Sequence, residues 1–370
     1  MHTMKKNFGE ITKFFFFIFF YFFLFDLLIG NYVYKKILRK NYFDVEHNMG
    51  KKHSIYHHAL KKNFSTNSAG WGKKRFSFCT DNHSFRIECG SKQTGKFFDI
   101  GIIGDSFTVG FGLSYKEMFV TKISKKLKNK KIANLAASSY APSIYYSKIN
   151  YLLDNGFKFN EIIVFLDLSD LHDDTIKYEL LENKVLGKDN DFNVENYSLS
   201  EKFLQFLSRN FKVTNFLVIQ TNEFLIKKKI KDRTIPHWVL QNPRSSWTYN
   251  YDKKYYLGKN LDDVIKNSKF NMLQLYDLLK KNNIELSIAV FPWPSTLKFD
   301  EENNLHLKTW KKFCITRCKN FFNMMSPFFE AKNKMKFNKL YFKYYIDGDI
   351  HFNETGNDVL SETFLSLYKE

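Results

Sequence analysis

Cysteine is scarce in this sequence, with four cysteines among 370 residues. No cysteine or histidine spacing matches a zinc site, so we expect neither a metal nor a cofactor. Cys79 and Cys89 flank a short polar segment, and in an exported domain they would close a small loop as a disulfide. Cys314 and Cys318 stand four positions apart on an expected helix, which favours packing over bridging.

The sequence also lacks the common signatures of nucleotide and nucleic-acid binding. The glycine-containing loop in residues 97–113 has neither the ending of a P-loop nor a dinucleotide fingerprint. The formal net charge is +19, but the lysines are scattered among Asn, Phe and Ile without a concentrated basic arm. We therefore expect no nucleic-acid partner and attribute the charge to composition, although an anionic lipid or an acidic glycan would profit from it.

A small-residue cleavage site is missing after the one long apolar run, residues 14–34. This run is long enough to cross a bilayer core of about 30 Å and contains only Asp26 and Asn31 as strongly polar residues. We therefore predict an uncleaved membrane anchor in residues 1–40. Positive charges are more numerous after the run than before it, and this count alone would put the C-terminal side in the cytoplasm.

The most informative stretch begins with an apolar run from Phe97, the pattern of a strand that is buried on both faces of a parallel sheet. The run ends at Gly104, Asp105 and Ser106. Small and polar residues at the carboxyl end of such a strand lie where open α/β sheets bind ligands. Ser106 is therefore a candidate nucleophile, provided that a base reaches it.

A candidate base lies near the other end of the chain. His351 follows Asp349 by two residues and Asp347 by four, just before an expected C-terminal helix. A carboxylate can hold Nδ1 of such a histidine while Nε2 takes the proton of a serine hydroxyl. The sequence thus predicts a Ser106, His351 and Asp349 site, with Asp347 as the rival carboxylate.

These two segments, GDSFTVG and DIHFNETGN, resemble the SGNH (GDSL-type) hydrolases, which include acyltransferases acting on sugars. The resemblance implies an α/β fold, a three-layer α/β/α sandwich with a central parallel sheet of flavodoxin-like type. It also implies that the anchored domain lies on the outer side of a bacterial inner membrane. The family's aspartate often stands three residues before the histidine, a position that is Gly348 in this chain.

Acyl transfer also requires donors for an oxyanion, and the amide of the nucleophile is one of them. In the family, a glycine amide after the second strand and an asparagine side chain after the third supply the others. This chain has Ser139 and Ser169 at those positions, so the expected oxyanion donors are Ser106, Ser139 and, less well suited, Ser169. Asp167 and Asp170 are expected to be structural, because a carboxylate facing an oxyanion would repel it.

Three regions follow from the pattern. Residues 1–40 form the anchor, residues 41–95 are lead-in strands and loops, and residues 96–370 form the SGNH-like domain. An insertion at about 171–258 interrupts the strand and helix alternation and would be either a lid or substrate wall, or an ordinary helical subdomain. Its aromatic residues Trp247, Tyr249 and Tyr251 would suit stacking on sugar rings or packing in a core. In the lead-in region, His57 and His58 are interpreted as surface residues.

The predicted activity is that of a serine-dependent esterase that removes or transfers O-acyl groups on a carbohydrate or a related ester. An acyltransferase would use the same residues. A non-catalytic glycan-binding or assembly protein on a degenerate fold is the alternative, favoured by Ser139 and Ser169 and opposed by Ser106, Asp349 and His351.

Overall fold

The computed structural model describes residues 2–38, 49–71, 74–92, 95–188, 206–207, 210–218, 221 and 234–368. The chain divides into two compact units. One unit comprises Met1–Phe43 and Asp191–Thr234, and the other comprises Asp44–Asn190 and Ile235–Glu370. The expected insertion at 171–258 is therefore divided between the two units.

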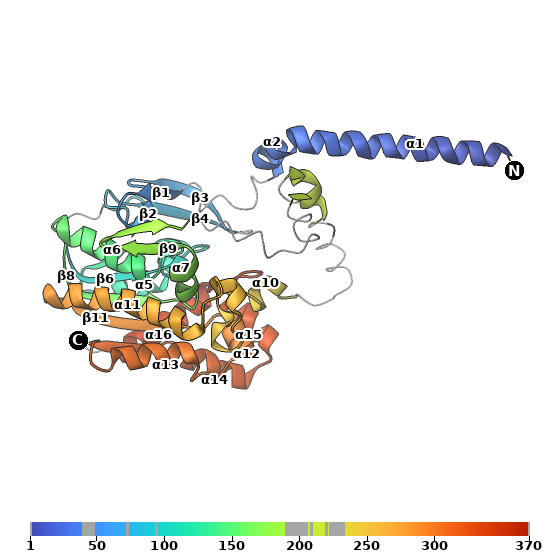
Figure 1. The fold of residues 1–370 in the computed structure, drawn as a ribbon. Helices are drawn as coiled ribbons and strands as arrows, with labels where there is room; N and C mark the ends of the chain where they lie inside the picture. Colours follow the sequence, from blue (N-terminus) through green and yellow to red (C-terminus); the bar gives the residue numbers. More distant parts are fainter. Residues whose placement is uncertain are drawn as a thin grey trace. The chain divides into compact units, whose positions relative to one another are not determined.

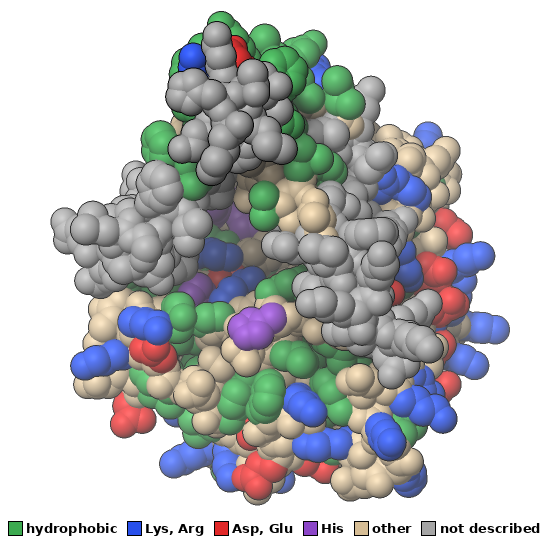
Figure 2. Space-filling view, turned by 90° about the vertical axis from the view of Figure 1, so that its right-hand side faces the viewer, with side chains coloured by type: hydrophobic (Ala, Val, Ile, Leu, Met, Phe, Trp, Pro, Cys, Tyr) green, Lys and Arg blue, Asp and Glu red, His purple; other side chains and the backbone are tan. Residues whose placement is uncertain are grey.

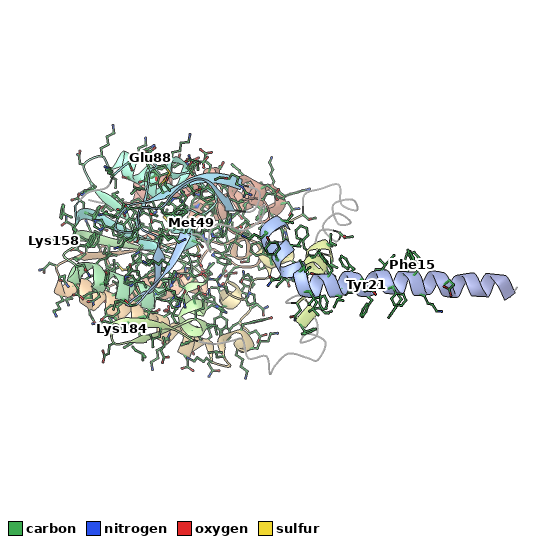
Figure 3. All side chains as sticks on the ribbon, turned by 90° about the horizontal axis from the view of Figure 1, so that it is seen from above. Phe15, Tyr21, Met49, Glu88, Lys158 and Lys184 are labelled. Carbon is green, nitrogen blue, oxygen red and sulfur yellow. A yellow bond between two sulfur atoms is a disulfide. The ribbon has the colours of Figure 1, made fainter. Side chains whose placement is uncertain are left out.

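The first unit is built on an apolar N-terminal helix, α1, His2–Phe25, which continues through η1, Asp26–Gly30, α2, Asn31–Val33, and η2, Tyr34–Leu38. The stretch Lys13–Val33 is long and apolar enough to span a bilayer. Its aromatic side chains are exposed, and those of Phe15 and Tyr21 project away from the helix (Figure 3). A membrane anchor and a signal sequence share these properties.

Asp26, the acidic residue within this stretch, is fully buried in the unit. Its carboxylate accepts hydrogen bonds from the Val213 amide (2.9 Å), the Thr214 amide (2.7 Å) and the Thr214 hydroxyl. Gly30 leaves room for this carboxylate, because a Cβ there would lie 1.8 Å from Asp26 Oδ1. Asp26 thus satisfies backbone donors at the start of the helical segment 212–218.

The second unit contains a five-stranded parallel sheet with the order β12-β11-β8-β6-β7 (Figure 1). The strands are β6, Phe97–Gly104, β7, Ile132–Asn134, β8, Lys158–Leu166, β11, Glu285–Val290, and β12, Asn320–Asn323. In chain order this arrangement is 2-1-3-4-5, the flavodoxin-like order. The expected fold class is confirmed, and the short strand β12 lies at one edge of the sheet.

Helices cover both faces of this sheet, as right-handed crossovers require. The chain passes from β6 to β7 in one direction and from β7 to β8 in the other, so α5, Phe119–Lys126, and α6, Pro142–Asp154, lie on opposite faces. Helix α11, Leu261–Lys281, packs beside α6 (Figure 1), and α16, Glu354–Leu367, packs beside α5. The other helices described in this unit are α4, Ser106–Val109, η4, Tyr115–Glu117, α7, Asp170–Ile176, α10, His237–Leu240, η6, Ser246–Thr248, η7, Lys253–Tyr256, α12, Pro294–Phe299, α13, Leu305–Cys314, α14, Ser326–Lys334, and α15, Phe337–Tyr344.

The lead-in region forms two small antiparallel sheets. Strands β1, Gly50–His53, and β2, His57–Leu60, make a hairpin. Strands β3, Ser65–Trp71, β4, Lys74–Thr80, and β5, Arg86–Ile87, make the second sheet, and β5 lies beside the edge strand β7. The lead-in strands expected from the sequence are therefore present, and the second of their sheets lies next to one edge of the main sheet. A third hairpin, β9, Tyr178–Leu181, with β10, Lys184–Gly187, follows α7.

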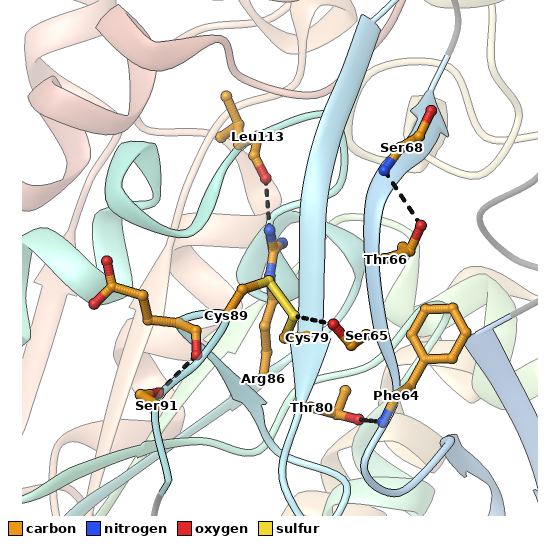
Figure 4. The surroundings of a disulfide bond; sticks show 11 residues. Phe64, Ser65, Thr66, Ser68, Cys79, Thr80, Arg86, Cys89, Ser91 and Leu113 are labelled. Atoms are coloured by element: carbon orange, nitrogen blue, oxygen red, sulfur yellow. Dashed lines mark hydrogen bonds between the residues drawn. A yellow bond between two sulfur atoms is a disulfide. The ribbon is translucent and has the colours of Figure 1, made fainter.

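A disulfide joins Cys79 on β4 to Cys89 after β5, as the sequence predicted (Figure 4). Cys314 and Cys318 also form a disulfide, so the prediction that they pack without bridging was wrong. The reason is that α13 ends at Cys314 and does not continue to Cys318. The tighter turn that follows brings the two Cα atoms to 4.7 Å, within the range that a disulfide spans.

Arg86 connects the lead-in sheet to the loop that follows the Ser106 helix. Its guanidinium is fully buried and donates to the carbonyl oxygens of Val109, Gly110 (2.6 Å) and Leu113 (2.5 Å), the last of which is drawn in Figure 4. It also lies 4.4 Å from the ring centroid of Phe78. Burial lowers the pKa of Arg86 to about 9, against the opposing effects of Tyr115 and Glu117. The three carbonyl groups and the aromatic ring offset part of the hydration that the buried cation loses.

The surface does not concentrate its charge on the face that Figure 2 shows. There, Lys and Arg side chains are interspersed with Asp, Glu and apolar side chains. This distribution agrees with a compositional origin for the net charge of +19.

We predict that Arg86→Met destabilises the chain by about 3–5 kcal/mol, because three buried carbonyl groups lose their donor. The measurement is the free energy of unfolding from chemical denaturation of the full chain. Arg75→Met, at an exposed position of β4, is the matched control and should change stability by about 0.5 kcal/mol or less. Equal effects of the two substitutions would contradict the role given to Arg86.

Candidate active site

Ser106 lies at the carboxyl end of β6, where it begins α4. The turn into this helix needs glycine at residue 104, since a Cβ there would lie 2.3 Å from Thr108 Oγ1 and 2.9 Å from the Phe165 carbonyl oxygen. Asp105 is the N-cap, and its Oδ1 accepts from the Phe107 amide at 2.9 Å. The half-buried Ser106 side chain is thereby fixed at the carboxyl end of β6, the position predicted from the sequence.

His351 reaches Ser106 from the loop between α15 and α16. Its Nε2 lies 2.8 Å from Ser106 Oγ, and its Nδ1 lies 2.5 Å from Asp349 Oδ1. Because a carboxylate can only accept, Nδ1 carries the ring proton and Nε2 is free to accept from the serine hydroxyl. The structure thus brings together the three side chains that the sequence singled out.

Asp349 is held from two sides. Its Oδ2 accepts from Trp71 Nε1 at 2.8 Å, and its backbone amide donates to the Tyr341 hydroxyl at 2.9 Å. Burial alone would raise the pKa of Asp349, but His351 and the hydrogen bonds from His351 and Trp71 lower it below its usual value. Asp349 is therefore ionised whenever the histidine is functional as a base.

The rival carboxylate, Asp347, is exposed, and the histidine contacts Asp349. Gly348, between them, has φ of +78°. This left-handed residue turns the chain so that the carboxylate two positions before His351 reaches Nδ1. The geometry favours Asp349 over Asp347, and over the spacing of three that the family often has.

Aromatic rings fix the imidazole plane. The ring of Trp71 lies edge-on to His351 at a centroid distance of 5.0 Å, and the ring of Phe107 lies 4.5 Å away at 35°. Trp71 therefore serves both His351 and Asp349. No local sequence pattern predicts the contact between Trp71 and Asp349, because 278 residues separate them.

The other two expected oxyanion residues follow the strands on either side of β6. Ser139 follows β7 and has φ of +54°, a conformation that non-glycine residues adopt at a cost of about 1–2 kcal/mol. It thus keeps the backbone geometry expected of a glycine. Ser169 follows β8, is buried, and donates its amide to Asp167 Oδ1. Their roles as donors to an oxyanion stay predictions.

A buried pair of carboxyl groups lies behind Ser106. Both carboxyl groups, those of Asp105 and Asp167, are almost fully buried. Burial first, and the charge of Asp167 second, raise the pKa of Asp105 well above its usual value. Asp105 Oδ2 lies 3.3 Å from Ser106 Oγ, a longer contact than the 2.8 Å between Ser106 Oγ and His351 Nε2.

Asp167 and Asp170 are structural in this geometry, as expected. Asp167 Oδ2 accepts from Trp293 Nε1 at 2.9 Å, and Asp170 Oδ2 accepts from the Tyr145 hydroxyl at 2.9 Å. Arg244, which donates to Asp173 Oδ2 at 2.8 Å, supplies a positive charge to the same cluster. Sequence reasoning missed Arg244, whose sequence context gave no signal.

His57 and His58 are half-buried in the β1–β2 hairpin, so their assignment to the surface was wrong. His58 Nε2 donates to the Ser138 carbonyl at 2.6 Å, next to Ser139. Burial lowers the pKa of His58 to about 4, which leaves its Nδ1 as an acceptor for His57 Nδ1 at 2.8 Å. The hairpin thus supports the loop that carries Ser139.

The aromatic residues of the insertion belong largely to the packing. Trp247 is fully buried and donates from Nε1 to the Leu168 carbonyl at 2.8 Å, so it is not available for stacking on a sugar. Much of the middle of the insertion, residues 189–205, 208–209, 219–220 and 222–233, lies outside the described residues, so the choice between a lid and a helical subdomain stays a prediction. Within the described residues, no group of three or more His, Cys, Asp or Glu side chains could hold a metal ion.

No protein-family model and no curated protein matches this chain. Solved structures do match it. A lipolytic protein of the G-D-S-L family from Veillonella parvula is 10% identical, with a TM-score of 0.39 over 73% of this chain and 97% of that chain. A mutant of Axe2, an acetylxylan esterase from Geobacillus stearothermophilus, is 10% identical, with a TM-score of 0.39 over 76% and 95%. The esterase EstA from Pseudoalteromonas is 10% identical, with a TM-score of 0.35 over 74% and 96%.

We predict that Asp105→Asn removes a loss of stability at rising pH. Because the pKa of Asp105 is raised in the folded state, protonated Asp105 contributes to the free energy of unfolding. This contribution is complete below the usual carboxyl pKa of about 3.9 and is lost as pH rises through the folded-state pKa. Asparagine is neutral at every pH and does not titrate. The difference in unfolding free energy between variant and parent should therefore grow by about 1.4 kcal/mol per pH unit across that window. Denaturation of both chains at a series of pH values from about 4 upward measures this difference, and parallel pH profiles would contradict the raised pKa of Asp105.

Proposed function

We propose that this chain is a membrane-anchored, serine-dependent esterase of the SGNH type. The observation that carries the proposal is the 2.8 Å contact between Ser106 Oγ and His351 Nε2, with His351 Nδ1 held by Asp349. A hydroxyl paired with an oriented neutral imidazole is the arrangement of an activated nucleophile. Residues 1–40 would form the anchor, residues 41–95 the lead-in, and residues 96–370 the catalytic domain.

In the proposed reaction, His351 Nε2 removes the proton from Ser106 as Oγ attacks the ester carbonyl. The resulting imidazolium is stabilised by Asp349, and it then protonates the leaving alcohol as the ester C–O bond breaks. A water or a second hydroxyl attacks the acyl-serine by the same route in reverse. Hydrolysis and acyl transfer therefore share these residues and differ in the acceptor.

The oxyanion would be bound by the amides of Ser106 and Ser139. Ser169 would replace an asparagine amide by a shorter hydroxyl, and one oxyanion donor is typically worth about 100- to 1000-fold in rate. This departure is the observation that favours the second candidate, a non-catalytic glycan-binding protein on the same fold. We rank it second because Ser106, His351 and Asp349 are placed for chemistry.

The proposed substrate is an O-acyl group on a carbohydrate or a related ester. The class is supported by the resemblance of the two motifs to a family that includes enzymes acting on sugars. One of the similar solved structures is that of an acetylxylan esterase, an enzyme named for an acylated carbohydrate. The substrate itself would be found by offering acylated glycans to the purified chain once turnover of a simple ester is established.

The proposed location is the inner membrane, with one spanning helix and the catalytic domain outside the cytoplasm. The two disulfides support it, because such bonds persist in oxidising compartments. Denatured samples treated with a maleimide reagent without reductant should then show no adducts, and four after reduction. Four adducts before reduction would place the domain in the cytoplasm.

The main test is hydrolysis of p-nitrophenyl acetate by the full chain in detergent, beside Ser106→Ala and His351→Ala. We expect turnover by the parent and a loss of about 1000-fold or more in each variant. A fluorophosphonate should label the parent at Ser106. If the parent shows no turnover and no labelling, the esterase proposal is rejected and the binding protein is selected.

Asp349→Asn should lower kcat by about 1000-fold or more. An asparagine amide can donate to His351 Nδ1, and this favours the tautomer that carries its proton on Nε2, where it can no longer accept the proton of Ser106. The matched control is Asp347→Asn, two residues away and exposed, which should leave kcat within about twofold. Comparable losses in both variants would contradict the assignment of Asp349.

A further inference from the structure

A cavity lies at the opposite end of the central sheet from Ser106. Its volume is about 640 Å³. Lys96, immediately before β6, and Phe157, immediately before β8, are among its lining residues. Ser106 follows the other end of β6, and eight residues of strand separate the two ends by about 25 Å. The cavity is therefore separate from the candidate active site.

The side chains around this cavity, which we name the basic cavity, are of one charge sign. Its sixteen lining residues include four lysines and two histidines but no Asp or Glu. They are Lys51, Lys52, Lys62, Lys96, His53 and His83. Among the described residues, no carboxylate forms an ion pair with any of these four lysines. The positive charge is thus left uncompensated by protein groups at the cavity.

The lysines of the basic cavity contribute to lowered pKa values of its two histidines. Burial is the main cause that lowers the pKa of His53 to about 4, and Lys148, Lys62 and Lys51 lower it further. The pKa of His83 is lowered by burial, and by Lys62 and Lys96 against the opposing effect of Asp81. His53 is therefore neutral, and its Nδ1 accepts from the amides of Ile55 (3.2 Å) and Tyr56 (3.4 Å), so its Nε2 carries a proton. The cavity then offers a neutral donor beside its ammonium groups.

The cavity is also preformed. His53 stacks on Tyr56 at a centroid distance of 3.6 Å and meets Tyr151 edge-on at 4.7 Å. Lys96 Nζ donates to the Asn155 carbonyl at 2.7 Å and lies 5.7 Å from the Phe157 ring. The lining thus combines aromatic side chains with the polar side chains of serine and asparagine, and this combination suits a ligand with apolar and hydroxyl groups, such as a sugar. The volume falls in the range of small-molecule sites, about 300–1000 Å³.

We propose that the basic cavity binds an anionic sugar, one that carries a phosphate or a carboxylate group. The ammonium groups of Lys62 and Lys96 would receive the anion, and the aromatic residues would receive the ring. This site does not depend on the chemistry proposed for Ser106. An anionic sugar bound here would be a ligand of the domain that is distinct from an ester undergoing hydrolysis.

The test is titration calorimetry of the full chain in detergent at low salt, with four probes: glucose 1-phosphate, glucuronic acid, inorganic phosphate and glucose. We expect at least one anionic sugar to bind more tightly than both inorganic phosphate and glucose. The tighter of the two sugars identifies the anion. The double variant Lys62→Gln with Lys96→Gln should weaken that binding about tenfold or more, since two of the four lysine charges at the cavity are removed.

The control is Lys125→Gln with Lys126→Gln, which removes the same charge from exposed positions of α5 and should leave the affinity within about twofold. Equal weakening in the two double variants would overturn the proposal, because it would show a general charge effect. Binding of inorganic phosphate as tight as that of the tighter anionic sugar would also overturn the proposal, as would the absence of saturable binding for both anionic sugars. Hydrolysis of p-nitrophenyl acetate by the cavity variant should match that of the parent, which separates this site from the proposed esterase.

Discussion

The turn from β6 into α4 can form only because residue 104 has no side chain. A Cβ at this point would collide with Thr108 and with the backbone of Phe165 on the neighbouring strand. With glycine there, the strand ends directly on a helix that Asp105 caps, and Ser106 occupies the first helical position. The candidate site depends on this close approach, since a longer connection would leave the serine without a fixed position at the sheet edge.

Charge is the second constraint on the site. Asp105, Asp167 and Asp170 are buried together, and a fully ionised cluster of this kind is unstable in a protein interior. The raised pKa values of Asp105 and Asp170 favour the neutral forms of these two groups, and Arg244 supplies a nearby positive charge. Asp349 is treated differently: its partners favour the ionised form. Two kinds of carboxyl environment therefore lie on either side of Ser106, and only one of them orients a base.

Much of this arrangement was predictable from the sequence, because it depends on local patterns. The strand before Ser106, the helix Leu261–Lys281 and the pair formed by His351 and Asp349 follow from apolar periodicity and from short spacing along the chain. The Cys314 bridge was not predictable, because it depends on where a helix ends, and boundaries are weakly encoded. Trp71 and Arg86 were missed because their partners lie far away in sequence, where no local pattern reports contact.

The hydrogen bond from Trp71 to Asp349 joins residues 278 positions apart, and it sets an order of events during synthesis. Ser106 and Trp71 precede Asp349 and His351 along the chain and leave the ribosome before them. Contacts of such high sequence separation are slow to form, because a long loop must close before they stabilise the fold. The contact between Ser106 and His351 therefore reports on assembly of the whole second unit, and a chain that lacked residues after Phe337–Tyr344 would keep the β6–α4 turn but not this contact.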